Sequence, residues 1–263
     1  MFPLPDSGVP GGRSAARYRT RAVLAAVAFA LGAVPFAVLL LLVEDTWTPL
    51  AAADQGARDD LDRYALGHPG FVSLMRVLSD SGSALAWLVV LVVVVGWLVW
   101  RRLWRLALFA AVTGAGSSLL NTVVKLVVHR ARPVVEQPLV QEPGASFPSG
   151  HSQAAVTGYG ILLLVFLPVL AGVWRRAAVA AALLMVLGIG FSRVALAAHF
   201  VSDVIGGFIL GGAWLAGMTS LFSAWRVQRG RPRVSPAEGL APEQADRIDP
   251  TERHPERRAP APE

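Results

Sequence analysis

The sequence predicts an all-α protein, an integral membrane bundle of six transmembrane helices. Its 263 residues are 54% hydrophobic and 16% charged. Ordinary globular domains carry about 25% charged residues, so much of this surface must face something other than water. Six apolar stretches reach or approach the roughly 20 residues that a membrane span requires. They are residues 22–43, 83–100, 106–128, 152–171, 177–191 and 204–225.

The first and the fifth stretch need separate justification. Residues 22–43 follow four arginines, as the core of a signal peptide would, but they exceed the roughly 7–15 apolar residues of a cleavable core. We therefore expect an uncleaved anchor. The fifth stretch is short unless it continues past Ser192 towards Ala198, which would place Arg193 at the edge of the membrane.

Two tails flank a predicted membrane domain that covers residues 22–225. Residues 1–21 form the N-terminal tail. Residues 226–263 are rich in Pro, Glu and Arg and poor in aromatic side chains, a composition typical of disorder. The sequence thus predicts one membrane domain with a short tail before it and a disordered tail after it.

Basic residues predict how the bundle is oriented. Both tails and the turns at 101–105 and 172–176 fall on one side and hold 17 of the 24 Lys and Arg residues, and the other side holds seven. Cytoplasmic loops carry the excess of basic residues, so we expect a multi-pass plasma membrane protein with both termini cytoplasmic. Topology then accounts for the net charge of +6, and no nucleic-acid partner is expected. The absence of cysteine excludes disulfides and thiolate metal sites.

The outer loop at 44–82 contains a helical pattern. Phe71, Leu74, Met75 and Leu78 recur at the spacing of one helix face. Such an amphipathic helix lies on the membrane surface or packs on the bundle, and the pattern leaves both alternatives open.

The first of three polar clusters is Lys125-x6-Arg132-Pro133, which contains the only lysine of the chain. On a continuous helix the two cations share one face, about 10 Å apart along the axis. Pro133 disfavours helix at Arg132, so the alternative is that the last turn opens and Arg132 swings inward. A cation within a span usually faces a functional site, which we expect for Lys125. For Arg130 we expect the side chain to reach for the lipid headgroups.

The second cluster, Pro148-Ser149-Gly150-His151, lies directly before the fourth apolar stretch. Glycine lets the backbone approach a ligand closely, and the first amides of a helix point towards anions. Together with the hydroxyl of Ser149 they would form a phosphate cradle, with His151 as a candidate proton donor. The alternative is a turn that caps a helix.

The third cluster is Ser192-Arg193-x5-His199-x3-Asp203. His199 and Asp203 are four residues apart and share a helix face, so the carboxylate can orient the imidazole and make its other nitrogen a better nucleophile. A purely structural pair is the alternative. Arg193 supplies a planar cation that suits phosphate oxygens.

The three clusters together resemble the signature motifs of the type 2 phosphatidic acid phosphatase family, which shares its site with vanadium haloperoxidases. The family pattern reads K-x6-RP, PSGH and SR-x5-H-x3-D, and it spans residues 125–203 here. The resemblance implies six spans and an outward-facing site without metal or other cofactor.

It also implies a role for each residue of the motifs. His199 would attack phosphorus, Asp203 would orient it, and His151 would protonate the leaving group. The phosphoryl oxygens would be held by Lys125, Arg132, Ser149, Gly150 and Arg193.

The function implied by the resemblance is hydrolysis of a lipid phosphate in the membrane. A polyprenyl diphosphate such as undecaprenyl diphosphate is slightly preferred because of the outer location, with phosphatidic acid and phosphatidylglycerol phosphate as alternatives. The same residues would serve a phosphotransferase, and a transporter with a polar relay or a vanadate-dependent halide oxidation is less favoured. Gly207-x3-Gly211 suits close helix packing within the bundle better than between copies, and the oligomeric state is left open.

Overall fold

The computed structural model describes residues 32–248 except 137 and 141, and within these residues the regular secondary structure is helical, apart from one isolated β-bridge. The N-terminal tail and the start of the first apolar stretch lie outside the described residues. After a helix over Gly32–Glu44 the chain forms α2 (Thr48–Leu66), α3 (Pro69–Ser81), α4 (Ala84–Trp100), α5 (Trp104–Val128), α6 (Gly150–Phe166), α7 (Gly172–Ala195), α8 (Val201–Gln228) and the short α9 (Ala245–Ile248).

Four of the described helical segments are long and apolar enough to cross a membrane on their own: α5, α6 with its extension to Val169, α7 and α8. Two further spans arise if each of two bent helix pairs counts as one, namely Gly32–Glu44 with α2 (bent by 84°) and α3 with α4 (bent by 44°). The predicted all-α membrane bundle is confirmed, with four to six candidate spans. The fifth stretch, which is short by sequence, is long enough to be a candidate span because α7 extends from Gly172 to Ala195.

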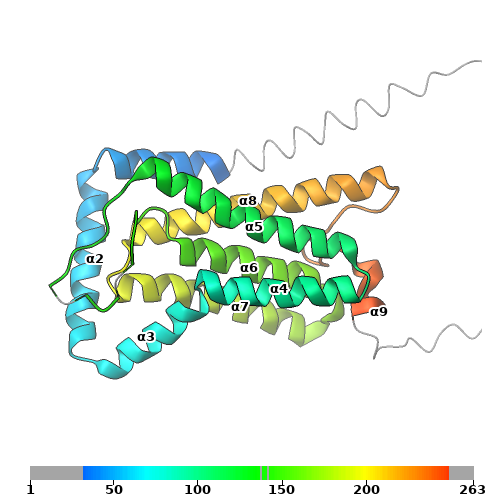
Figure 1. The fold of residues 1–263 in the computed structure, drawn as a ribbon, viewed down its shortest axis with the longest axis horizontal. Coiled ribbons are helices and arrows are strands. Elements are labelled where there is room, and N and C mark those ends of the chain that lie inside the picture. Colours follow the sequence, from blue (N-terminus) through cyan, green and yellow to red (C-terminus); the bar gives the residue numbers. More distant parts are fainter. Residues whose placement is uncertain (1–31, 137, 141, 249–263) are drawn as a thin grey trace, which may run out of the picture.

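The predicted loop at 44–82 folds into α2 and α3, and α2 stands across one end of the bundle (Figure 1). On α3, Val72 and Met75 are buried in a cluster with Ala195 and Leu196 at the end of α7. The amphipathic helix therefore packs on the bundle, which was one of its two predicted placements. Leu74 stays 56% exposed.

Helix α5 ends before it reaches Arg132. The helix stops at Val128, and His129 adopts a left-handed backbone with φ of 46°. Lys125 and Arg132 therefore do not share a helix face, and the alternative in which the chain opens before Pro133 describes the structure. Arg132 lies in the segment between α5 and α6, from where it turns back towards the bundle.

Residues 229–248 differ from the disordered tail that their composition predicts. Leu240, Ala241 and Ile248 are buried in the main hydrophobic cluster of the bundle. Arg226, only 2% exposed, is paired with Glu243 through two contacts of 2.9 Å. Buried apolar side chains and a satisfied buried cation together offset the entropy of ordering this segment. Residues 249–263 lie outside the described residues.

Glycines allow α6 and α8 to touch through their backbones. A Cβ at Gly207 would lie 2.6 Å from the carbonyl oxygen of Ser149, and one at Gly211 would lie 2.9 Å from that of Gln153. Gly207-x3-Gly211 thus serves packing within the bundle, as preferred from the sequence. This contact holds the Pro148–His151 motif directly against the helix that carries Asp203.

Gly207→Ala is expected to lower the stability of the fold by about 1–3 kcal/mol, the usual cost of overpacking a tight interface. The added methyl group would push the start of α6 away from α8, because the atom it meets belongs to the backbone. Thermal unfolding in detergent measures the effect. Gly212→Ala is the matched control, since a Cβ there meets nothing within 4 Å; equal melting temperatures for the two variants would contradict the argument.

Candidate active site

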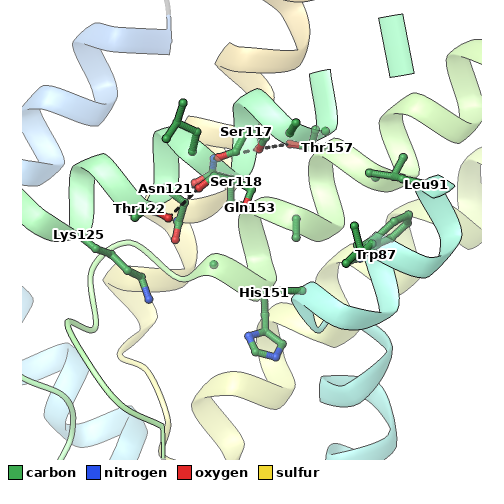
Figure 2. A pocket seen from close by; sticks show the side chains of 18 of the residues that line it. Trp87, Leu91, Ser117, Ser118, Asn121, Thr122, Lys125, His151, Gln153 and Thr157 are labelled. Carbon is green, nitrogen blue, oxygen red and sulfur yellow. Dashed lines mark hydrogen bonds between the residues drawn. The ribbon is translucent and has the colours of Figure 1, made fainter. Parts of the chain in front are cut away.

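One cavity brings most of the predicted site residues together. It has a volume of about 1170 Å³. Its lining includes Lys125, Arg132, Gly150, His151 and His199. Lys125 and His151 extend from α5 and α6 into the same space (Figure 2). Three residue clusters that are far apart in the sequence thus converge at one end of the bundle.

His199 lies in the short connection between α7 and α8 and is 1% exposed. Its Nδ1 lies 3.4 Å from Oδ2 of Asp203 on the first turn of α8. Its Nε2 lies 3.2 Å from Nη1 of Arg132, which can only donate. Burial lowers the pKa of His199 to about 4 against the opposing effect of Asp203. The imidazole is therefore neutral at neutral pH, and the lone pair on Nε2 accepts from Arg132 at the edge of the cavity.

Glu142 occupies the centre of the cationic site, and no sequence pattern pointed to it. Its carboxylate is paired with Arg193 and lies 3.3 Å from Nη1 of Arg132. The Nε2 atoms of His151 and His199 each lie 4.0 Å from one of its oxygens. Burial raises the pKa of Glu142, but the surrounding cations outweigh burial and hold that pKa below its ordinary value. An anion thus sits between the two histidines.

Arg193 and Ser149 lie behind the cavity wall. Arg193 is 1% exposed, donates to Ser79 of α3 and reaches the site through its pair with Glu142. Ser149 is fully buried and forms the N-cap of α6, where its hydroxyl accepts from the amide of Ser152 at 3.4 Å. The N-cap, the alternative that the sequence left open for this motif, is present, and Gly150 rather than Ser149 faces the cavity.

Arg130 differs from the expected lipid-facing cation. Its side chain turns inward and is paired with Asp54 of α2 and Asp203 of α8. Its guanidinium also lies 4.5 Å from the centre of the Phe200 ring. Two buried carboxylates hold this cation more strongly than headgroups at the surface would, because charges interact more strongly away from water.

Beyond the cations, the cavity descends along α4, α5 and α6 through a zone of uncharged polar side chains. Asn121 donates to Gln153 at 2.8 Å, and Gln153 donates to the carbonyl of Ser117 at 2.8 Å (Figure 2). The hydroxyls of Ser117 and Thr157 lie 3.0 Å apart. Past them the lining is apolar and comprises, among others, Trp87, Leu88, Leu91, Val92 and Val95. The cavity is therefore lined by charged residues at one end and by apolar residues at the other.

Glu142→Gln is expected to strengthen inhibition by inorganic phosphate about tenfold, equivalent to about 1.4 kcal/mol. The substitution removes an anion that would compete with phosphate for Arg193 and Arg132, both of which pair with Glu142. The inhibition constant of phosphate, measured by its effect on the hydrolysis of a phosphate ester, reports the change. Glu136→Gln is the matched control because Glu136 lies exposed in the same segment. Unchanged or weaker inhibition in Glu142→Gln would show that the carboxylate does not occupy the anion site.

Comparison with known proteins agrees with this geometry. A family model described as the PAP2 superfamily matches residues 102–228. Phosphatidylglycerophosphatase B of Bacillus subtilis (strain 168) is 40% identical over 166 residues, which make up 60% of this chain and 80% of the relative. The chain belongs to the PAP2 superfamily. The family assignment made from the three motifs is thereby confirmed.

A solved PAP2 structure shares the fold. It is the crystal structure described as the first transmembrane PAP2 type phosphatidylglycerolphosphate phosphatase from Bacillus subtilis. The match has a TM-score of 0.63 and 28% identity, and covers 75% of this chain and 98% of the other. The protein is therefore a multi-pass membrane PAP2 phosphatase that acts on phosphate esters of lipids and resembles phosphatidylglycerophosphatase B.

Proposed function

We propose that this PAP2 protein hydrolyses a lipid phosphate through a phosphohistidine on His199. The observation that carries the proposal is the position of the Glu142 carboxylate, 4.0 Å from Nε2 of each of two histidines. A phosphoryl group in the same place would have His199 on one side and His151 on the other. That arrangement is what in-line displacement at phosphorus requires.

The proposed reaction has two steps. In the first, the lone pair on Nε2 of His199 attacks phosphorus, the bond to the lipid oxygen breaks, and His151 gives its proton to that oxygen. In the second, His151 takes a proton from water, which attacks phosphorus and breaks the phosphorus–nitrogen bond. Inorganic phosphate leaves, and both histidines return to their initial state.

Fixed cations stabilise the charge that develops on the phosphoryl oxygens in this proposal. Arg132 and Arg193 already hold the Glu142 carboxylate, and Lys125 lines the same cavity. The amide end of α6 at Gly150 adds a positive dipole. Oδ2 of Asp203 lies 3.4 Å from Nδ1 of His199 and favours the tautomer that carries its proton on Nδ1, so that the lone pair is on Nε2.

The shape of the cavity supports a lipid as the substrate. The phosphate would sit at the charged end, the alcohol or ester groups beside Asn121 and Gln153, and the hydrocarbon along α4 and α5. The name of the B. subtilis relative makes phosphatidylglycerol phosphate the first candidate. A polyprenyl diphosphate, which the sequence slightly favoured, fits the same charged end and is the second candidate.

Release of inorganic phosphate by the purified protein in detergent, with EDTA present, tests this function. The substrates are phosphatidylglycerol phosphate, undecaprenyl diphosphate, phosphatidic acid and a water-soluble phosphomonoester. We expect release from the lipids and much slower release from the soluble ester. A folded protein that releases no phosphate from any lipid, or that transfers the phosphoryl group to an added alcohol instead of water, would contradict the proposal.

We further propose that the membrane domain covers residues 22–225, with the site at the extracytoplasmic face and both termini in the cytoplasm. The excess of basic residues in the tails and in the 101–105 and 172–176 turns supports this orientation. Since the chain has no cysteine, Val134→Cys and Ala237→Cys each introduce a single thiol, one at either end. An impermeant maleimide should label Val134→Cys in intact cells and Ala237→Cys only after permeabilisation; the reverse pattern would invert the orientation.

A further inference from the structure

We propose that Asp54 and Arg130 are positioning residues that hold the Asp203–His199 pair in its reactive geometry. The inference rests on the proposed function and extends it to α2, which the three signature motifs do not include. Asp54 is a carboxylate of the outer helix α2 and is only 2% exposed. A buried carboxylate is costly unless it is paired. The partners of Asp54 are Ser202, in the first turn of α8, and Arg130, which in turn donates to Asp203 in that turn.

The carboxylate of Asp203 is held on both of its oxygens. Oδ2, the oxygen that faces His199, accepts from the backbone amide of Phe200 at 2.9 Å. Oδ1 accepts from Nη1 of Arg130. A carboxylate fixed at one oxygen can still rotate about χ2, whereas one fixed at both cannot. Arg130 therefore sets the plane in which Asp203 meets the imidazole of His199.

Arg130 is itself fixed by a set of contacts from three directions. Its Nη2 donates to Oδ2 of Asp54 at 2.9 Å, and its Nη1 donates to the hydroxyl of Ser202 at 2.7 Å. Its Cζ lies 4.5 Å from the centre of the Phe200 ring, within the range of a cation–π contact. A forked cation with two carboxylate partners is pre-organised, so it can transmit the position of Asp54 to Asp203.

Asp54 also holds the start of α8 directly. The backbone amide of Ser202 donates to Oδ1 of Asp54 at 2.9 Å, and the hydroxyl of Ser202 donates to Oδ2. A carboxylate that accepts from an amide of the first turn caps the helix and complements its dipole. The turn that carries Asp203 is thus capped by a residue 148 positions before Ser202.

The series of contacts Asp54–Arg130–Asp203–His199 ends at the proposed nucleophile. Asp54 and Arg130 themselves do not line the cavity, and their ion-pair partners are each other and Asp203. Their loss should leave substrate binding intact and misplace the imidazole. Misplacement of a reacting group by about 1 Å costs about 100-fold in rate. Loss of either positioning residue should therefore lower kcat and leave KM nearly unchanged.

The test measures kcat and KM for phosphate release from phosphatidic acid, together with the melting temperature, for Asp54→Asn, Arg130→Gln and the double variant. We expect each single variant to lower kcat by about 10- to 100-fold with KM within about threefold of the native value. The double variant should be no slower than the slower single variant, because both act through one chain of contacts. Asp60→Asn is the matched control, an exposed carboxylate on the same helix.

Several results would overturn the inference. Native kcat in Asp54→Asn, a rise in KM that matches the fall in kcat, or losses that multiply in the double variant each contradict a shared positioning role. If Asp54→Asn does not fold, the kcat of Arg130→Lys tests the positioning role instead. Lysine keeps the positive charge but cannot donate from two nitrogens to Asp54 and Asp203 at once. A native kcat in Arg130→Lys would reject the role. Absence of phosphate release by the native protein would instead reject the proposed function, and the inference with it.

Discussion

His199→Ala is expected to lower phosphate release from lipid substrates by at least about 10⁴-fold, the scale on which enzymes lose activity when the nucleophile is removed. In the proposed mechanism the imidazole supplies the attacking atom. The described neighbours of its Nε2, Arg132 and Glu142, cannot replace it: a guanidinium has no free lone pair, and the carboxylate is held by cations. The initial rate at saturating lipid measures the loss.

Two controls separate loss of chemistry from loss of fold. His68→Ala removes an exposed imidazole at the start of α3 and should retain native activity. His199→Ala should still bind inorganic phosphate, because Arg132, Arg193 and Lys125 remain. A folded His199→Ala variant with more than about a tenth of native activity would exclude phosphohistidine chemistry, since the residual catalysis of such variants is far smaller.

Arg193→Ala is expected to lower kcat/KM by about 10²- to 10³-fold, the usual cost of removing one fixed group that stabilises transition-state charge. Arg193 is 1% exposed and bridges Ser79 and Glu142. Its removal takes away a planar two-pronged cation and leaves the Glu142 carboxylate with less compensation. Both activity and melting temperature should therefore fall.

The double variant Arg193→Ala with Glu142→Gln distinguishes the two losses. Neutralising Glu142 removes the uncompensated charge, so the melting temperature should recover towards the native value. Activity should stay low if Arg193 stabilises the phosphoryl oxygens as proposed, because that cation is still missing. Recovery of activity together with stability would mean that Arg193 acts only as a structural partner of Glu142.

The fold and the signature residues could be predicted because their signals are local in sequence. Apolar runs of membrane length predict spans. The four-residue spacing of His199 and Asp203 predicts a pair on one helix face, whereas His199 lies in the connection before α8 and its Nδ1 still lies 3.4 Å from Oδ2 of Asp203. For the end of α5, the proline at position 133 is compatible with two alternatives, a continuous helix and an opened last turn. The left-handed turn at His129 decided between them.

The remaining site residues could not be predicted, because their signals are contacts between distant segments. Glu142 meets Arg193 across 51 residues, and Arg130 meets Asp203 across 73 residues. No periodicity or motif encodes such pairs; they exist only once the bundle has formed. The same reason explains residues 229–248, whose composition indicates disorder but whose Leu240 is buried against the bundle and whose Glu243 pairs with the buried Arg226 of α8.

The glycine contact between α6 and α8 has a mechanical consequence. Two helices whose backbones touch at Gly207 and Gly211 cannot part without losing the contact along its length, so the segments that carry His151 and Asp203 behave as one stiff block. The opposite wall of the cavity is built from the valine- and leucine-rich α4 and the small residues of α5, including Ala111, Gly114 and Ala115. A lipid tail in the cavity would therefore lie against α4 and α5, away from the α6–α8 contact that holds the proposed reacting groups together.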